Sequence, residues 1–159
     1  MDVNLLIVQQ FFPESPPMDL TLADEAKKHG LAMDYLETVE EQFQMLSQLP
    51  EAYSIQGLEQ SVLETDTLRE EIRIMLESYR AGDAARLEEL IVNNDAFNTW
   101  PKARDTMLMD RNARWVPQIE AYIQQGNVFI AVGLGHLVGD GSVIDRLNKR
   151  GHTVRRVAL

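Results

Sequence analysis

Apolar residues recur every three or four positions over much of the chain, with charged residues between them. Residues 58–79 show this spacing most clearly, which predicts a long amphipathic helix with Met75, Leu76 and Tyr79 in the core. Residues 102–125 predict another helix, which ends at Gly126 and holds Pro117, the position of a kink or of a junction between two helices. Shorter helices are predicted at residues 21–29, after Asp83 and after Ser142. Another begins at residue 38, where Thr38 and Glu41 have the spacing of a capping box.

Three stretches predict strands, namely residues 31–36, 127–132 and 152–158. The second is almost entirely apolar, which is typical of a strand buried on both faces. The helix after Ser142 connects the last two, which predicts a strand–helix–strand crossover with parallel strands. We therefore expect one domain over residues 1–159, of the α+β (α/β-like) class, with several helices on a small, partly parallel sheet. A further apolar run at residues 5–12 fits either a helix end or a strand.

The composition of the chain excludes some classes of site and argues against some partners. The 159 residues include no cysteine, so thiolate zinc sites, thiol catalysis and disulfides are excluded. A net charge of −10 argues against nucleic acid as a partner and against an anionic membrane surface, and it leaves solubility or cationic partners, including metal ions. No apolar run is long enough to predict membrane insertion.

A glycine-rich turn follows the second predicted strand. Gly133 and Gly135 precede His136, and four glycines fall within residues 133–141, where they let the backbone turn sharply or approach a ligand closely. Open α/β sheets bind ligands at such strand ends, where His136 could bind a metal or transfer a proton. The alternative is a structural turn with an exposed imidazole. A dinucleotide site is disfavoured, because the spacing is Gly-x-Gly-x-x-x-Gly and the helix begins later.

Two polar residues share the apolar face of the helix at 102–125. Arg111 and Asn112 fall in the same arc as Trp115, whereas Arg114 faces away. A buried charge needs a partner, and Glu37 is the expected carboxylate. The pair would be either an internal tie between helix and sheet or a polar site under the His136 turn. Glu37 itself fits a metal ligand or general base, or a solvated acid at a helix start.

Five segments, taken in this order, resemble the TraB/GumN family, which includes the Tiki proteases and is related to ChaN-like and erythromycin-esterase-like proteins. The resemblance spans residues 20–157 and is carried by residues 36–42, 79–83, 111–115, 128–139 and 151–157. It implies a metal-dependent hydrolase that cleaves a peptide or amide bond. The family pattern has two Gly-x-x-His motifs with a glutamate and an Arg-Asn pair between them.

The resemblance implies a role for each matching residue. His136 and Glu37 would hold or neighbour a divalent cation (Mn, Co or Zn), Arg111 would stabilise oxyanion charge and Asn112 would orient a ligand. Gly133 and Gly135 would lie against a peptide or small-molecule substrate. The competing class is a non-catalytic ligand- or haem-binding module of the ChaN-like type.

One departure from the family pattern stands out, because the sequence holds no first Gly-x-x-His motif. We therefore expect the chain to be the C-terminal portion of a longer domain, whose exposed surface would favour a homodimer. The family implies a periplasmic or exported location, although residues 1–10 lack the basic region of a signal peptide.

Overall fold

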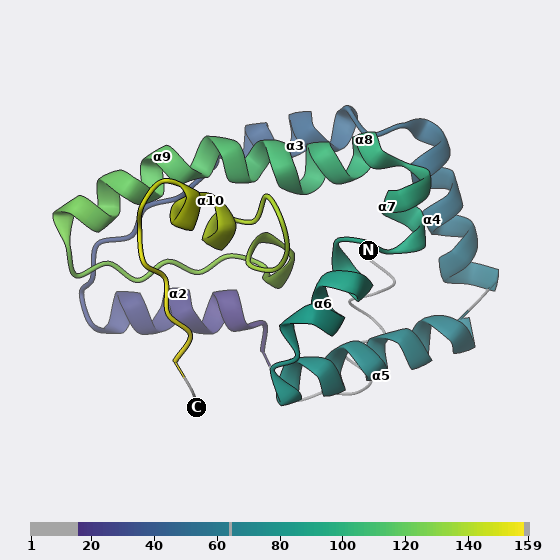
Figure 1. Cartoon of the computed structure of the whole chain (residues 1–159), viewed down its shortest axis with the longest axis horizontal. Coiled ribbons are helices and arrows are strands. Elements are labelled where there is room, and N and C mark those ends of the chain that lie inside the picture. The colour runs from purple at the N-terminus through teal and green to yellow at the C-terminus, as the bar shows by residue number, and fades with distance from the viewer. Residues whose placement is uncertain (1–15, 64, 158–159) are drawn as a thin grey trace.

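The computed structural model describes residues 16–63 and 65–157, and helices make up most of them (Figure 1). In chain order the elements are α2 (Met18–Lys28), α3 (Val39–Ser47), α4 (Glu51–Leu63), α5 (Thr65–Ala81), α6 (Ala84–Ile91), α7 (Asp95–Thr99), α8 (Pro101–Arg104), the π-helical η1 (Asp105–Met109), α9 (Asp110–Gln125), the 3-10 turn η2 (Leu134–His136) and α10 (Val143–Lys149). The apolar run at residues 5–12 lies outside the described residues.

The prediction of an α+β domain with a parallel sheet is wrong, because no strand occurs within residues 16–63 and 65–157. Residues 31–36, 127–132 and 152–157, which were expected to be strands, run without regular secondary structure, and none of these segments pairs with a neighbour as a strand must. Ile130 and Val132 pack instead against side chains of α9 and α10. Phe129 is 78% exposed, so this apolar run is buried on one side only.

The long helix predicted at residues 58–79 is replaced by two helices, α4 and α5, which run in different directions (Figure 1). Of the residues expected in the core, Met75 and Leu76 are half-buried, and the nearby Ile72 is buried. Leu58 and Tyr79 are exposed, because α4 and α5 run in different directions and do not share the single apolar face that the spacing implied.

The second long helix is confirmed. Helical structure runs from Pro101, at the first helical position, through the π-helical η1 to the end of α9 at Gly126, which adopts a φ of 73°. Pro117 lies on the exposed side of α9, which continues past it to Gln125. The predicted capping box is also present, since Thr38 and Glu41 bond each other's backbone N–H groups at the start of α3.

Two groups of buried side chains form the interior. The first lies between the helices from α6 to η1 and includes Leu87, Val92, Phe97, Ala103, Leu108 and Val138. The second joins α9 to α10 and includes Trp115, Val116, Ile119, Val143 and Leu147. Between the two groups lies the glycine-rich turn, because Val138 belongs to the first while the His136 ring contacts Trp115 of the second.

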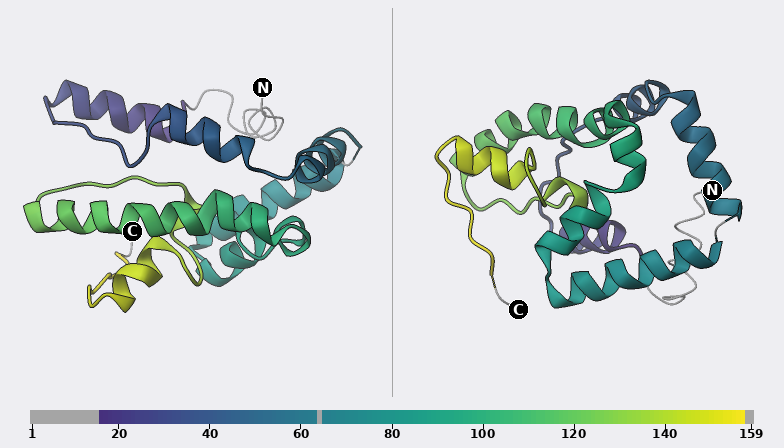
Figure 2. Two further views of the ribbon diagram at one scale, coloured as in Figure 1. Left: turned by 90° about the horizontal axis from the view of Figure 1, so that it is seen from above. Right: turned by 45° about the vertical axis from the view of Figure 1, so that its right-hand side comes forward.

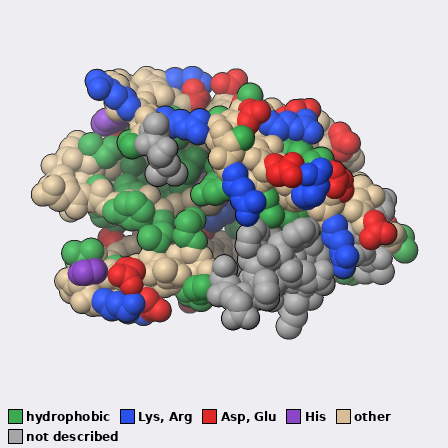
Figure 3. Space-filling model, turned by 90° about the horizontal axis from the view of Figure 1, so that it is seen from below, with side chains coloured by type: hydrophobic (Ala, Val, Ile, Leu, Met, Phe, Trp, Pro, Cys, Tyr) green, Lys and Arg blue, Asp and Glu red, His purple; other side chains and the backbone are tan. Residues whose placement is uncertain are grey.

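The view from above shows α2 and α3 as a layer separate from the one that contains α9 (Figure 2). On the face seen from below, hydrophobic side chains gather in a hollow beside α2 (Figure 3). The exposed apolar residues of the extended segments include Leu31, Val128, Phe129 and Val154. No helix within the described residues is long and apolar enough to cross a membrane.

The packing predicts a large loss of stability on substitution of one phenylalanine and a small change at another. Phe97→Ala should lower the free energy of unfolding by about 3–5 kcal/mol, because it leaves a cavity in the first group. Phe129→Ala, at a side chain 78% exposed, should change it by less than about 0.5 kcal/mol. Urea denaturation followed by circular dichroism measures both, and equal effects would contradict the burial described here.

Candidate functional site

The His136 turn packs closely against the helical layer. A Cβ atom at Gly135 would lie 3.0 Å from Cγ2 of Ile91 and 3.4 Å from Cδ2 of Leu108, so a larger residue would require these side chains to shift by a few tenths of an ångström. The close approach buries the imidazole of His136 to 6% exposure. The exposed imidazole that the structural-turn alternative expected is therefore not found, and Gly135 takes part in the packing of the turn.

Asn112 determines which nitrogen of His136 carries the proton. Its Nδ2 donates to the carbonyl oxygen of Gly141 at 2.9 Å, which leaves Oδ1 to face His136 Nδ1 at 2.7 Å. Because Oδ1 can only accept, Nδ1 must be the donor. The other ring nitrogen, Nε2, then carries the lone pair, and it makes none of the hydrogen bonds found among the described residues. Asn112 is wholly buried, so this arrangement is held rigidly.

Burial also sets the charge state of the imidazole. The pKa of His136 is lowered to about 4, chiefly by desolvation and also by the positive charge of Arg111, while Glu37 acts in the opposite direction. His136 is therefore neutral at pH 7. A neutral imidazole with a fixed tautomer is the form that binds a metal or accepts a proton.

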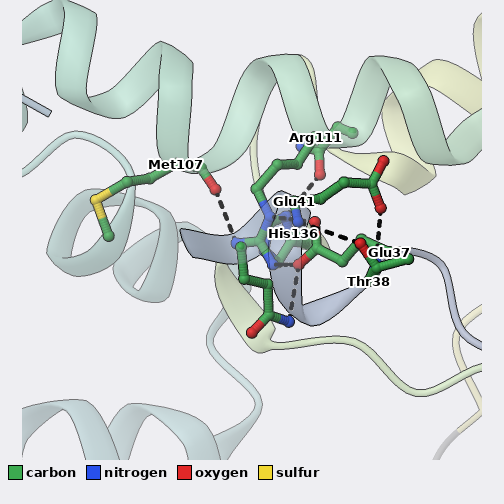
Figure 4. A network of polar contacts seen from close by, with 8 residues as sticks. Glu37, Thr38, Glu41, Met107, Arg111 and His136 are labelled. Atoms are coloured by element: carbon green, nitrogen blue, oxygen red, sulfur yellow. Dashed lines mark hydrogen bonds and ion pairs between the residues drawn. The ribbon is translucent and has the colours of Figure 1, made fainter. Parts of the chain in front are cut away.

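Arg111 and Glu37 form the buried ion pair that the helical face predicted (Figure 4). Arg111 Nε donates to Glu37 Oε2 at 3.1 Å, and Nη2 donates to Oε1. The third nitrogen of the guanidinium, Nη1, donates to the carbonyl oxygen of Met107 in η1 at 3.1 Å. The side chains of Glu37 and Arg111 are 7% and 16% exposed, so the pair is largely buried. With no sheet in the described fold, the pair ties α9 to the turn before α3.

Two residues of the site have no role in the sequence argument beyond packing. Trp115 lies beside both charged and neutral groups, with Arg111 Cζ 4.7 Å from its ring centroid and the His136 ring centroid 4.5 Å away. Gln42 Nε2 donates to Glu37 Oε1 at 3.1 Å. The shared helical face could have indicated Trp115, whereas a separation of five residues, as between Glu37 and Gln42, matches no recognised pattern of contact.

The donor set is short of a complete metal site. Within residues 16–63 and 65–157, no three His, Asp or Glu side chains lie together as a metal site requires. His136 Nε2 offers one lone pair, whereas both oxygens of Glu37 already accept hydrogen bonds from Arg111. The described residues therefore fit one imidazole ligand of a metal, and further ligands would have to come from elsewhere.

The fold and site define a helical domain in which a neutral histidine lies beside a buried Arg–Glu pair. The chain belongs to the TraB/PrgY/gumN family, whose family model matches residues 5–156, so the family resemblance is confirmed. It is 28% identical to Metalloprotease TIKI2 of Danio rerio over 88% of this chain and 32% of that protein. It is 27% identical to Metalloprotease TIKI1 of Homo sapiens over 87% of this chain and 33% of that protein.

A third relative, Metalloprotease TIKI homolog of Nematostella vectensis, is 25% identical over 89% of this chain and 36% of its own length. The chain thus spans about a third of the length of the curated relatives it matches. No solved structure matches it at a significant level.

The environment of His136 predicts a titration at acidic pH. In the chelator-treated chain, the imidazole resonances of His136 should titrate near pH 4 rather than near the ordinary 6.5. His136 would then bind a proton more readily in the unfolded state than in the folded state. Its effect on the free energy of unfolding is therefore most favourable above about pH 6.5, and the folded state loses stability as the pH falls from 6.5 towards 4. NMR of ring protons measures the pKa, and a value at or above 6.5 would contradict the buried, neutral state.

Proposed function

We propose that the chain is part of a metal-dependent peptidase and contributes His136 to its active site. The observation that carries this proposal is the fixed tautomer of His136, with Nδ1–H held by Asn112 and Nε2 left as a lone pair. Histidines that bind catalytic metals are oriented in this way, through a hydrogen bond at the other nitrogen. The metalloprotease names of three relatives support a peptide substrate and a divalent metal.

Each neighbouring side chain has a defined role in this proposal. Asn112 orients the imidazole and keeps its proton on Nδ1. Glu37 holds Arg111 in place, while Nη1 and Nη2 of Arg111 each retain one N–H that can face the carbonyl oxygen of a bound amide. Burial of His136 and Trp115 excludes water from one side of the site.

A bound divalent cation would polarise the amide carbonyl and lower the pKa of a water molecule. His136 Nε2 would bind the cation, and Glu37 would lie beside it. Glu37 could bind the cation itself only if its carboxylate gave up a hydrogen bond from Arg111. Gly133, which is exposed beside the turn, would lie against the peptide. The chain covers about a third of the length of its relatives. Peptide cleavage by this chain alone is therefore a proposal and does not follow from the names of those relatives.

Cobalt binding tests the role of His136 directly. The wild-type chain should bind Co²⁺ with a visible absorption change, and His136→Ala should lose it. His29→Ala is the matched control, since that imidazole is 72% exposed and far along the chain from the turn. His136→Ala should cost about 1–3 kcal/mol by leaving Asn112 Oδ1 unpaired, so circular dichroism must confirm that the variant folds.

Peptide cleavage tests the reaction. Mass spectrometry of a mixed peptide library should show metal-dependent cleavage products that vanish with chelator and with His136→Ala. Metal binding without any cleavage would contradict peptidase activity of this chain. Binding that persists in His136→Ala would contradict the assignment of the ligand.

A further inference from the structure

A pocket lies between α9 and α10, formed by residues outside the His136 site. Its volume is about 230 Å³, and it is lined by Ala113, Val116, Arg146, Lys149 and Arg150. All three ionisable residues of this lining are cations, although the whole chain carries a net charge of −10. Two of these cations pair with carboxylates, Lys149 with Asp145 and Arg150 with Glu120, so Arg146 gives the lining an excess of one positive charge, which favours an anionic ligand.

The backbone anchors the first of these cations. Arg146 Nε donates to the carbonyl oxygen of Gly141 at 2.9 Å, and Nη2 donates to that of Met109 at 3.3 Å. Both acceptors are neutral, so the charge of this guanidinium is not cancelled by a carboxylate that bonds it. The Gly141 carbonyl also accepts from Asn112, which orients His136. Arg146 is thereby held in one geometry before any ligand binds.

The other two cations, Lys149 and Arg150, each have N–H groups beyond those used in their ion pairs. Arg150 uses Nε and Nη2 in its pair with Glu120, at 2.8 and 2.6 Å, which leaves Nη1 without a described partner. Lys149 Nζ bonds Asp145 at 2.7 Å and has two further N–H groups. These pairs are partly exposed, and pairs of this kind are weak enough for a ligand to compete with them.

The pocket also has an apolar part. Val116 is buried and Ala113 lies one turn before it on α9, so the lining joins a hydrocarbon surface to three cationic groups. The volume is a little below the range of about 300–1,000 Å³ that is typical of ligand pockets, so the ligand would be small. We propose that this pocket binds a small organic anion, with a carboxylate or phosphate group at Arg146, Lys149 and Arg150 and a short apolar portion on Ala113 and Val116.

Calorimetric titration tests the proposal on the full chain. The probes are citrate and inorganic phosphate, added at constant ionic strength in sodium chloride so that screening does not change. The wild-type chain should bind at least one of them saturably: citrate binding would assign a carboxylate ligand, and binding of phosphate alone would assign a phosphate group. Absence of saturable binding by both probes would overturn the proposal.

Two variants separate the pocket from charge in general. The double variant K149Q/R150Q should weaken binding by at least about tenfold, because it removes two charge-assisted donors. The matched control K27Q/K28Q removes two exposed cations of α2 and should keep the wild-type affinity. Equal losses in the two variants would show non-specific attraction and would overturn the proposal.

Filling the pocket provides a test that leaves every charge in place. Ala113 is exposed, so Ala113→Phe should fold normally while its ring occupies the apolar part of the pocket. Binding should be lost in this variant. Unchanged binding in Ala113→Phe would place the anion outside the pocket and contradict the inference.

Discussion

The buried ion pair between Arg111 and Glu37 is the interaction on which the arrangement of this domain depends. Removing two charges from water is costly, and only close pairing with further hydrogen bonds offsets that cost. Arg111 meets this requirement with Glu37 and the Met107 carbonyl, and Glu37 with Arg111 and Gln42. The pair therefore holds the layer of α2 and α3 against α9, and a second bond between Tyr122 and Asp34 supports it at the far end of α9.

The same pair shapes the chemistry of the histidine. Arg111 lies over one side of Trp115 and His136 contacts the same ring, so the guanidinium charge acts on the imidazole across a buried, apolar environment. Burial and this charge together lower the pKa of His136, while Asn112 selects its tautomer. Position, charge state and proton location of the imidazole thus follow from packing within α9 and the glycine-rich turn.

Part of this arrangement could be predicted from the sequence. Helical spacing placed Arg111 and Asn112 on a buried face and indicated Glu37 as the partner, because an unpaired buried charge is so unfavourable. Local capping signals were similarly dependable, as Thr38 and Glu41 show. The sheet was predicted wrongly because a run such as residues 128–132 has the same apolar pattern whether it packs on strands or on helices. The contact of Gln42 with Glu37 depends on tertiary geometry that no spacing rule encodes.

A double-mutant cycle on Arg111→Met and Glu37→Gln measures the central interaction directly. The free energies of unfolding of the wild type, both single variants and the double variant give the coupling between the two side chains. A buried, hydrogen-bonded pair predicts a coupling of at least about 2 kcal/mol, because each single variant leaves an uncompensated polar group. A coupling below about 0.5 kcal/mol, as found for exposed ion pairs, would contradict the role assigned to this pair.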